Sequence, residues 1–164
     1  MRMAGNRTIA GGAAAQHAEA VEAAIVQTFD DGCGIRLAPS AGGTGPGDGD
    51  EAVIGIVSVG GAAAGTTFMA LGRGSAAAAA EAFLGTTVPF HHEDTCRAVG
   101  EVVALFSARL KAALRQRRLP CVTSTPAVLR AESLGAFIAE SAPRETACFC
   151  WRSGTVWVGA LGGA

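Results

Sequence analysis

The longest uninterrupted helical pattern in the chain is Glu93-Asp-Thr-Cys-Arg-Ala-Val-Gly-Glu-Val-Val-Ala-Leu-Phe-Ser-Ala-Arg-Leu-Lys-Ala-Ala-Leu-Arg115. Apolar residues recur in it at spacings of three and four, which predicts a helix that packs one face against a core. This core-facing stripe consists of Val99, Val102, Phe106, Leu110 and Ala113. Charged and small residues fall on the opposite side, where the backbone of a partner could come close: Asp94, Arg97, Glu101, Ala104 and Ala108.

The composition indicates a folded protein with a substantial core. The chain has 164 residues, 49% of them hydrophobic, which predicts a single domain over 1–164 and excludes general disorder. Its net charge is -1 and no basic face stands out, so nucleic acid is not an expected partner. No window approaches the roughly 18 apolar residues that a membrane span needs, so we expect no membrane segment.

The cysteines and the first residues of the chain bear on its cellular setting. The chain has five cysteines, an odd number, so they cannot all pair with one another. Residues 1–15 lack the apolar segment and the cleavage site of a signal peptide. We therefore expect a cytoplasmic protein whose thiols are free.

Short β-branched and apolar runs bounded by turn residues predict the strands. They lie at 33–37, 52–59, 65–71, 122–130 with an interruption at Pro126, 135–138, 146–152 and 155–161. Both faces of 52–59 are largely apolar, which predicts a central strand covered on each side. Because tight turns join neighbouring strands, the expected class is α+β, with a mostly antiparallel sheet and helices packed against it.

Two further helices are predicted. The first spans 13–30 and is stopped by Gly32 and Gly34, and the second spans 76–84 with Ser75 as its N-cap. Segments without periodicity, rich in Gly and polar residues, predict a flexible tail and a flexible loop. These segments are 1–12 and 39–50.

Two clusters of metal-ligating residue types occur in the sequence. One offers imidazole, carboxylate and thiol groups: His91, His92, Glu93, Asp94 and Cys96. Its spacing matches no known metal motif, and the start of the long helix accounts for it better. The other is Cys148-Phe-Cys150, which lacks the longer spacer and the second pair of zinc motifs. We therefore expect structural roles for both, with no metal or cofactor of the chain's own.

Within the long helix, the segment Gly100-Glu-Val-Val-Ala-Leu-Phe-Ser-Ala-Arg-Leu-Lys111 carries a motif. It resembles the signature helix of the CheX-type chemotaxis phosphatases, the group that includes CheC and FliY. That signature has Gly-Glu-x-x-Asn, then three residues and a Gly, and a Lys after two more. Further along, the family has a strand that opens on Pro, and Pro126 occupies that place here. The resemblance covers most of the chain, from near His17 to near Leu161.

The resemblance implies hydrolysis of the aspartyl phosphate on a CheY-type receiver domain of a response regulator. In that family the motif Asn orients the attacking water, and the motif Glu pairs with the active-site Lys of the receiver. The receiver brings its own magnesium. The catalysis is mainly positioning, as is general for phosphoryl transfer. The resemblance also implies a tendency to form homodimers.

Not every position of the signature is kept in this chain. Four positions match: Gly100, Glu101, Lys111 and Pro126. Ala104 stands where the Asn is expected, and Ala108 stands at the usual Gly. Arg97 lies one turn before the Glu, where related phosphatases have Asp or Ser. It is spaced to pair with Glu101 at i, i+4, and so to compete with the Lys of the receiver.

The departure at Ala104 leaves three hypotheses for function. A methyl group cannot orient water, and losing a positioning donor commonly costs about a hundredfold or more in rate. The chain is then a weak phosphatase of phosphorylated receivers, or a non-enzymatic domain that binds receivers through the same helix face. The third hypothesis is a module that dimerises or docks into a larger signalling protein. We favour the second.

Overall fold

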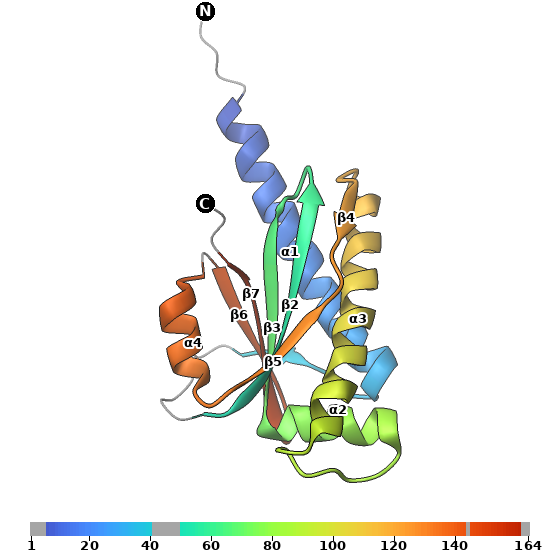
Figure 1. Ribbon diagram of the computed structural model, residues 1–164. Helices are drawn as coiled ribbons and strands as arrows, with labels where there is room; N and C mark the ends of the chain where they lie inside the picture. The colour runs from blue at the N-terminus through green and yellow to red at the C-terminus, as the bar shows by residue number, and fades with distance from the viewer. Residues whose placement is uncertain (1–5, 41–49, 144, 162–164) are drawn as a thin grey trace, which may run out of the picture.

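The computed structural model describes residues 6–40, 50–143 and 145–161, and in them it contains four helices and a seven-stranded sheet (Figure 1). In chain order the elements are α1 (Asn6–Cys33), β1 (Ala38–Pro39), β2 (Ala52–Gly61), β3 (Gly65–Gly72), α2 (Arg73–Leu84), α3 (Glu93–Gln116), β4 (Cys121–Thr123), β5 (Ala127–Ala131), α4 (Leu134–Ser141), β6 (Glu145–Trp151) and β7 (Gly154–Leu161).

The sheet is antiparallel at every strand pair. Its order is β1-β6-β7-β3-β2-β4, and β5 also pairs with β2. The long strand β2 is shared along one edge by two short strands: Ile54 lies opposite Leu129 of β5, and Gly60 lies opposite Val122 of β4. Pro126 falls between those two strands, as the sequence predicts. The α+β class with a mostly antiparallel sheet is confirmed.

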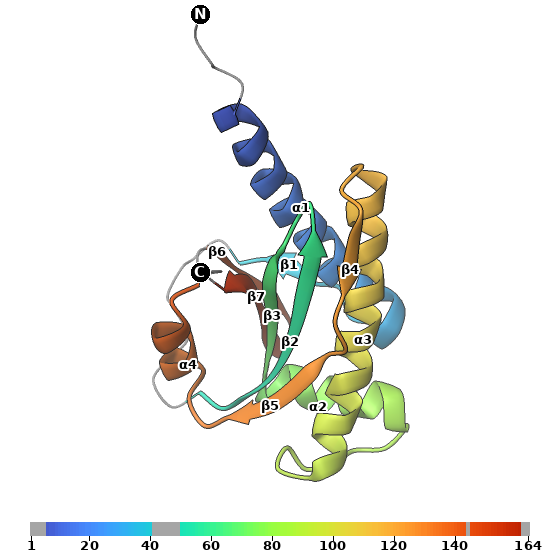
Figure 2. The same ribbon diagram turned by 45° about the horizontal axis from the view of Figure 1, so that its top comes forward.

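The helices are distributed unequally over the two faces of the sheet. The main buried cluster lies between one face and α1, α2 and α3, and it includes Phe29, Val53 and Phe106. A smaller cluster on the other face joins Ile54 and Phe68 with residues of α4. In Figures 1 and 2, α4 lies apart from the other three helices. The sheet is therefore covered on both sides of β2, as predicted for a central strand.

Helix α3 lies directly against β2, because Gly55 leaves room for it. A Cβ added at Gly55 would overlap the side chain of Val103, which is fully buried on α3. The core stripe of α3 contacts the same part of the core: Val99, Val102, Phe106 and Leu110 are buried, and Ala113 is half-buried. The predicted helix with one core-facing side and one outward side is confirmed. Its close packing against β2 determines which residues of α3 face outward.

Replacing Gly55 by alanine is expected to destabilise the protein. The added methyl group would force Val103 and α3 away from β2, and such overpacking costs about 1–3 kcal/mol of unfolding free energy. Thermal unfolding of Gly55→Ala against wild type measures the loss. Gly65→Ala is the matched control, since a Cβ at Gly65 meets nothing within 4 Å. Equal melting temperatures for the two variants would contradict the close packing.

The first part of the chain differs from the prediction. Helix α1 begins at Asn6, so residues 6–12 are helical, whereas residues 1–5 of the expected tail lie outside the described residues. The strand expected at 33–37 is not formed. Gly34, with φ of 66°, ends the helix, and the amide of Ile35 donates to the carbonyl of Phe29 at 2.9 Å. This helix-ending turn uses the residues that the strand pattern assigned to a sheet.

The expected flexible loop overlaps the described residues only at its ends. Pro39 belongs to β1, the two-residue strand that pairs with β6, and the amide of Ser40 donates to the carbonyl of Cys148 at 2.9 Å. Residues 41–49 of the predicted loop lie outside the described residues.

Two other expectations are wrong. Residues 135–138 lie in helix α4 and not in a strand, because Ser133 caps the helix and Leu134, Phe137 and Ile138 bring one apolar side onto the sheet. Ser75 is not the N-cap of α2. That helix begins three residues sooner, at Arg73, with Gly72 at the cap position. The buried Ser75 hydroxyl instead accepts a hydrogen bond from the Trp151 indole at 2.9 Å.

Candidate functional site

Helix α3 presents the predicted set of residues on the side away from the core, and we call Asp94, Arg97, Glu101, Ala104 and Ala108 the α3 outer face. All are exposed except Asp94, which is half-buried. The spacing of three and four residues places them along one side of the helix. Both views show this helix at the side of the molecule, with β4 running next to it (Figures 1 and 2). The structure thus brings the predicted residues together on one accessible surface.

The first turn of α3 is held by side chains on the helix itself. His92 is the N-cap, and its Nδ1 accepts a hydrogen bond from the amide of Asp94 at 3.2 Å. Glu93 and Asp94 lie in the first turn, where the helix dipole favours negative charge. The predicted helix-start role of this cluster is confirmed for His92.

Arg130 of β5 holds the segment that leads into α3. Its guanidinium donates to the carbonyls of Phe90, His91 and His92 at 3.0, 3.1 and 3.1 Å. It also lies over the Phe90 ring, with 5.5 Å to the ring centroid. One arginine therefore donates hydrogen bonds to three successive backbone carbonyls just before the helix begins. No sequence motif marks Arg130, so it was not among the predicted site residues.

The charges on the α3 outer face are paired differently from the expectation. Arg97 Nη1 lies 2.9 Å from Asp94 Oδ1, so the arginine pairs three residues back along the helix. The predicted i, i+4 pair with Glu101 is not formed. Glu101 has no hydrogen-bond or ion-pair partner within the part of the chain that the structure describes. Its carboxylate is left exposed and unpaired.

Helix α3 itself carries no amide side chain near Ala104. Ser107, the nearest hydroxyl along the helix, is only 6% exposed and faces the core. Along α3, which the structure describes in full, the exposed amide is Gln116. It lies twelve residues beyond Ala104, about 18 Å at the rise of an α-helix. Along α3, the free acid of the outer face therefore has no exposed amide side chain beside it.

The other matched positions of the signature are more enclosed. Lys111 is half-buried one turn beyond Ala108, and Pro126 is half-buried at the start of β5. A Cβ at Gly100 would lie 3.7 Å from Val128 of β5, so helix and strand are close there. These positions support the helix and its neighbour strand beneath the outer face.

The second predicted cluster lies far from α3 in the sheet. Cys148 and Cys150 are half-buried on β6, on the face opposite to the buried Phe149. All five cysteines are free thiols. Among the described residues, no group of three or more His, Cys, Asp or Glu side chains is arranged to hold a metal ion. His91 instead lies with Nε2 3.5 Å from Glu51 Oε1, and that carboxylate also binds Arg73.

Cys33, at the end of α1, is expected to react slowly with alkylating reagents. Burial raises the pKa of its thiol from 9.0 to about 11. At pH 9 the thiolate, which is the reactive form, is then roughly fiftyfold scarcer than in the denatured chain. In a variant that keeps only this cysteine, the iodoacetamide rate measures the effect, and the same variant in urea is the control. The native rate should keep rising up to about pH 11, whereas the denatured rate levels off near pH 9. A constant ratio of the two rates across this range would contradict the raised pKa.

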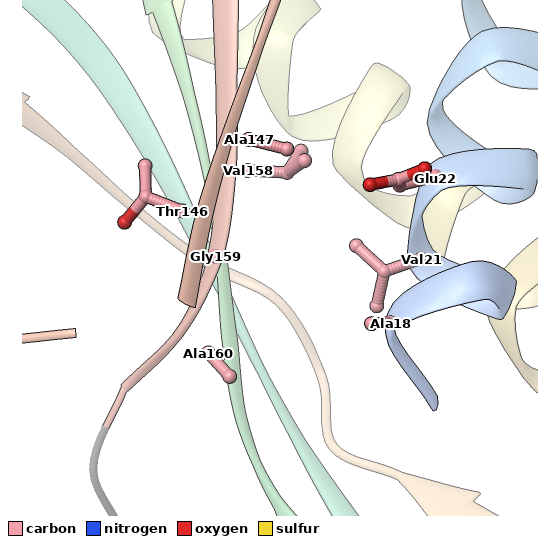
Figure 3. Close-up of a pocket in the computed structure, with 8 residues that line it drawn as sticks. All are labelled: Ala18, Val21, Glu22, Thr146, Ala147, Val158, Gly159 and Ala160. Carbon is pink, nitrogen blue, oxygen red and sulfur yellow. The ribbon is translucent and has the colours of Figure 1, made fainter. Parts of the chain in front are cut away.

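A small pocket lies elsewhere, between α1 and the β6–β7 hairpin (Figure 3). Its volume is about 200 Å³. Figure 3 shows Val21 and Glu22 of α1 pointing toward the strands, whereas Thr146 points away from the helix. Glu22 is its single ionisable side chain, so the pocket has no pair of groups for acid–base chemistry. Along the described residues, no helix has the length and hydrophobicity that crossing a membrane requires.

Comparison with known proteins relates this architecture to solved structures. No protein-family model and no curated protein matches the sequence. CheX from Vibrio vulnificus has a TM-score of 0.70 at 17% identity, over 88% of this chain and 95% of that one. CheX from Desulfovibrio desulfuricans has a TM-score of 0.67 at 21% identity, over 88% and 97%. CheX from Borrelia burgdorferi, solved in a CheX-CheY-BeF3-Mg+2 complex, has a TM-score of 0.65 at 16% identity, over 88% and 96%.

These similarities identify an α+β protein built on an antiparallel sheet with helices packed against it. The fold is that of the CheX-type chemotaxis proteins. The fold that the resemblance in the sequence implied is therefore confirmed.

Proposed function

We propose that the chain binds a phosphorylated CheY-type receiver domain through the α3 outer face and hydrolyses its aspartyl phosphate slowly or not at all. The observation that carries the proposal is the free carboxylate of Glu101, exposed on the helix that the signature motif marks. A CheX of the same fold was solved in complex with CheY, which supports a receiver as the kind of partner.

The chemistry of the face fits binding better than turnover. Glu101 offers one negative charge to the active-site Lys of a receiver, and a charge pair formed across an interface fixes the register of docking. Ala104 offers only a methyl group at the position that would orient the attacking water. We assign the magnesium to the receiver, because in this proposal the Glu101 carboxylate pairs with the active-site Lys of the receiver and is not available as a metal ligand.

Charge reversal at Glu101 tests the binding. Glu101→Lys is expected to weaken receiver binding about tenfold or more, because two like charges would then meet at the interface. Isothermal titration calorimetry against receivers from the same organism, loaded with beryllium fluoride and magnesium, measures the dissociation constant. Glu140→Lys is the matched control, since it makes the same charge change at an exposed position of α4, on the other side of the sheet.

Three outcomes separate the hypotheses. Binding that depends on Glu101, without faster loss of phosphate, supports the proposal. Fast loss of phosphate with the wild-type chain shows a competent phosphatase and contradicts the slow-turnover part. If the chain binds no receiver but self-associates through α3, the dimerisation alternative takes the place of the proposal.

A further inference from the structure

The pairing of charges on the α3 outer face decides whether Glu101 is available to a partner. Arg97 is spaced to reach either of two acids, Asp94 three residues before it or Glu101 four residues after it, and both spacings place side chains side by side on a helix. In the structure the arginine pairs with Asp94 at 2.9 Å, and its side chain is otherwise exposed. Glu101 has no partner in the described part of the chain.

Two features of the fold favour the pair with Asp94. Side chains on an α-helix tilt toward its N-terminus, so the guanidinium of Arg97 is carried toward Asp94 and away from Glu101. Asp94 is also held at its backbone, because Nδ1 of the N-cap His92 accepts a hydrogen bond from its amide. Its side chain is only 32% exposed. Ordering Asp94 for the pair therefore loses less side-chain freedom than ordering Glu101.

We infer that Asp94 is a positioning residue that keeps Arg97 away from Glu101, so that the Glu101 carboxylate stays free for a cation of the partner. The inference rests on the proposed function for its consequence in binding. Arg97 occupies a position where an unrestrained cation would neutralise the one free acid of the outer face. Asp94 removes that competition within the helix itself.

A double-mutant cycle tests the inference on the receiver complex. Asp94→Asn frees Arg97 and is expected to weaken receiver binding roughly twofold at low salt, the size of one exposed i, i+4 ion pair. In the Arg97→Gln background the same Asp94→Asn change should weaken binding measurably less than in the wild-type background, since no cation remains to move onto Glu101. An equal loss in both backgrounds means that Asp94 contacts the receiver directly, and no loss in either means that Arg97 does not move. Each of these results overturns the inference.

A second cycle on the free protein needs no receiver. The NMR signal of the Arg97 Nε–H group is expected to respond to Glu101→Gln in the Asp94→Asn variant but not in the wild-type background. A signal that ignores Glu101 in both backgrounds overturns the inference, whatever the binding data show. A wild-type chain that binds no receiver, together with the expected NMR response, would instead contradict the proposed function and leave the positioning role of Asp94 standing.

Discussion

Ala104→Asn is expected to raise the rate of receiver dephosphorylation about a hundredfold over the wild-type chain, because it restores a donor that orients the attacking water. Ala104 lies three residues beyond Glu101, so the new amide would project from the same side of the helix as the free carboxylate. The position is exposed, which leaves room for the longer side chain. Ser107 is buried and Gln116 lies twelve residues away, so neither side chain lies beside Glu101 on this face.

The measurement is the decay of a phosphorylated receiver under single-turnover conditions, with a receiver that the wild-type chain binds. Ala112→Asn is the matched control, because it makes the same substitution at an exposed position of α3 two turns further on. Both changes lower helix propensity by the same amount, about 0.7 kcal/mol or less, so a difference in rate is not a difference in folding. Equal rates for the two variants would show that the amide is not what the wild-type helix lacks.

A wild-type chain that already matches Ala104→Asn would be informative in another way. The water would then be oriented by a group outside the α3 outer face, supplied by the receiver or by a segment brought in on binding. In that case Glu101→Gln should still lower the rate, since the carboxylate positions the complex and not the water. The pair of variants therefore separates the docking role of Glu101 from the chemical role of position 104.

The parts of the fold that the sequence predicted well are those with a strong periodic signal. Helix α3 was placed to within one residue at its end, because one of its faces is apolar and the other is charged or small over six turns. Strands β2 and β3 were placed almost as closely. Residues 135–138 were not, because a short apolar run fits a strand and a helix equally well. The cap at Ser133 and the spacing from Leu134 to Ile138 decided for the helix.

The candidate site also has parts that the sequence predicts and parts that it does not. The α3 outer face follows from helical periodicity alone, so its members were predictable. The partner of Arg97 was not predicted, because spacing alone allows an ion pair with Asp94 or with Glu101. The tilt of helical side chains and the half-buried position of Asp94 favour Asp94. Arg130 was beyond prediction. Its partners are backbone carbonyls 38 to 40 residues earlier in the chain. Because every residue has a backbone carbonyl, the amino-acid sequence does not indicate which of them a side chain will contact.

Arg130→Met is expected to lower the free energy of unfolding by about 2–4 kcal/mol, which is large for a single surface-proximal side chain. The change removes the Arg130 donors to three carbonyls at once; the His92 carbonyl keeps its hydrogen bond from the Thr95 amide, whereas the carbonyls of Phe90 and His91 lose the arginine. It also removes the cation over the Phe90 ring. Urea denaturation measures the loss, and Arg97→Met is the matched control, because it shortens an exposed arginine whose only ion pair is worth about 0.5 kcal/mol or less.

The geometry of the carbonyls also predicts what a lysine would do at this position. The guanidinium reaches the carbonyls of residues 90 to 92 with two nitrogen atoms in a planar fork, whereas an ammonium group is a single point donor. Arg130→Lys should therefore recover only part of the stability that Arg130→Met loses. Because these carbonyls immediately precede α3, hydrogen exchange should quicken at amides 93 to 97 and not in the last turns of the helix. If hydrogen exchange in Arg130→Met quickens uniformly along α3, the hydrogen bonds of Arg130 support the core in general. If only the first turn loosens, Arg130 fixes the end of the helix that carries Asp94 and Arg97, and through them the free state of Glu101.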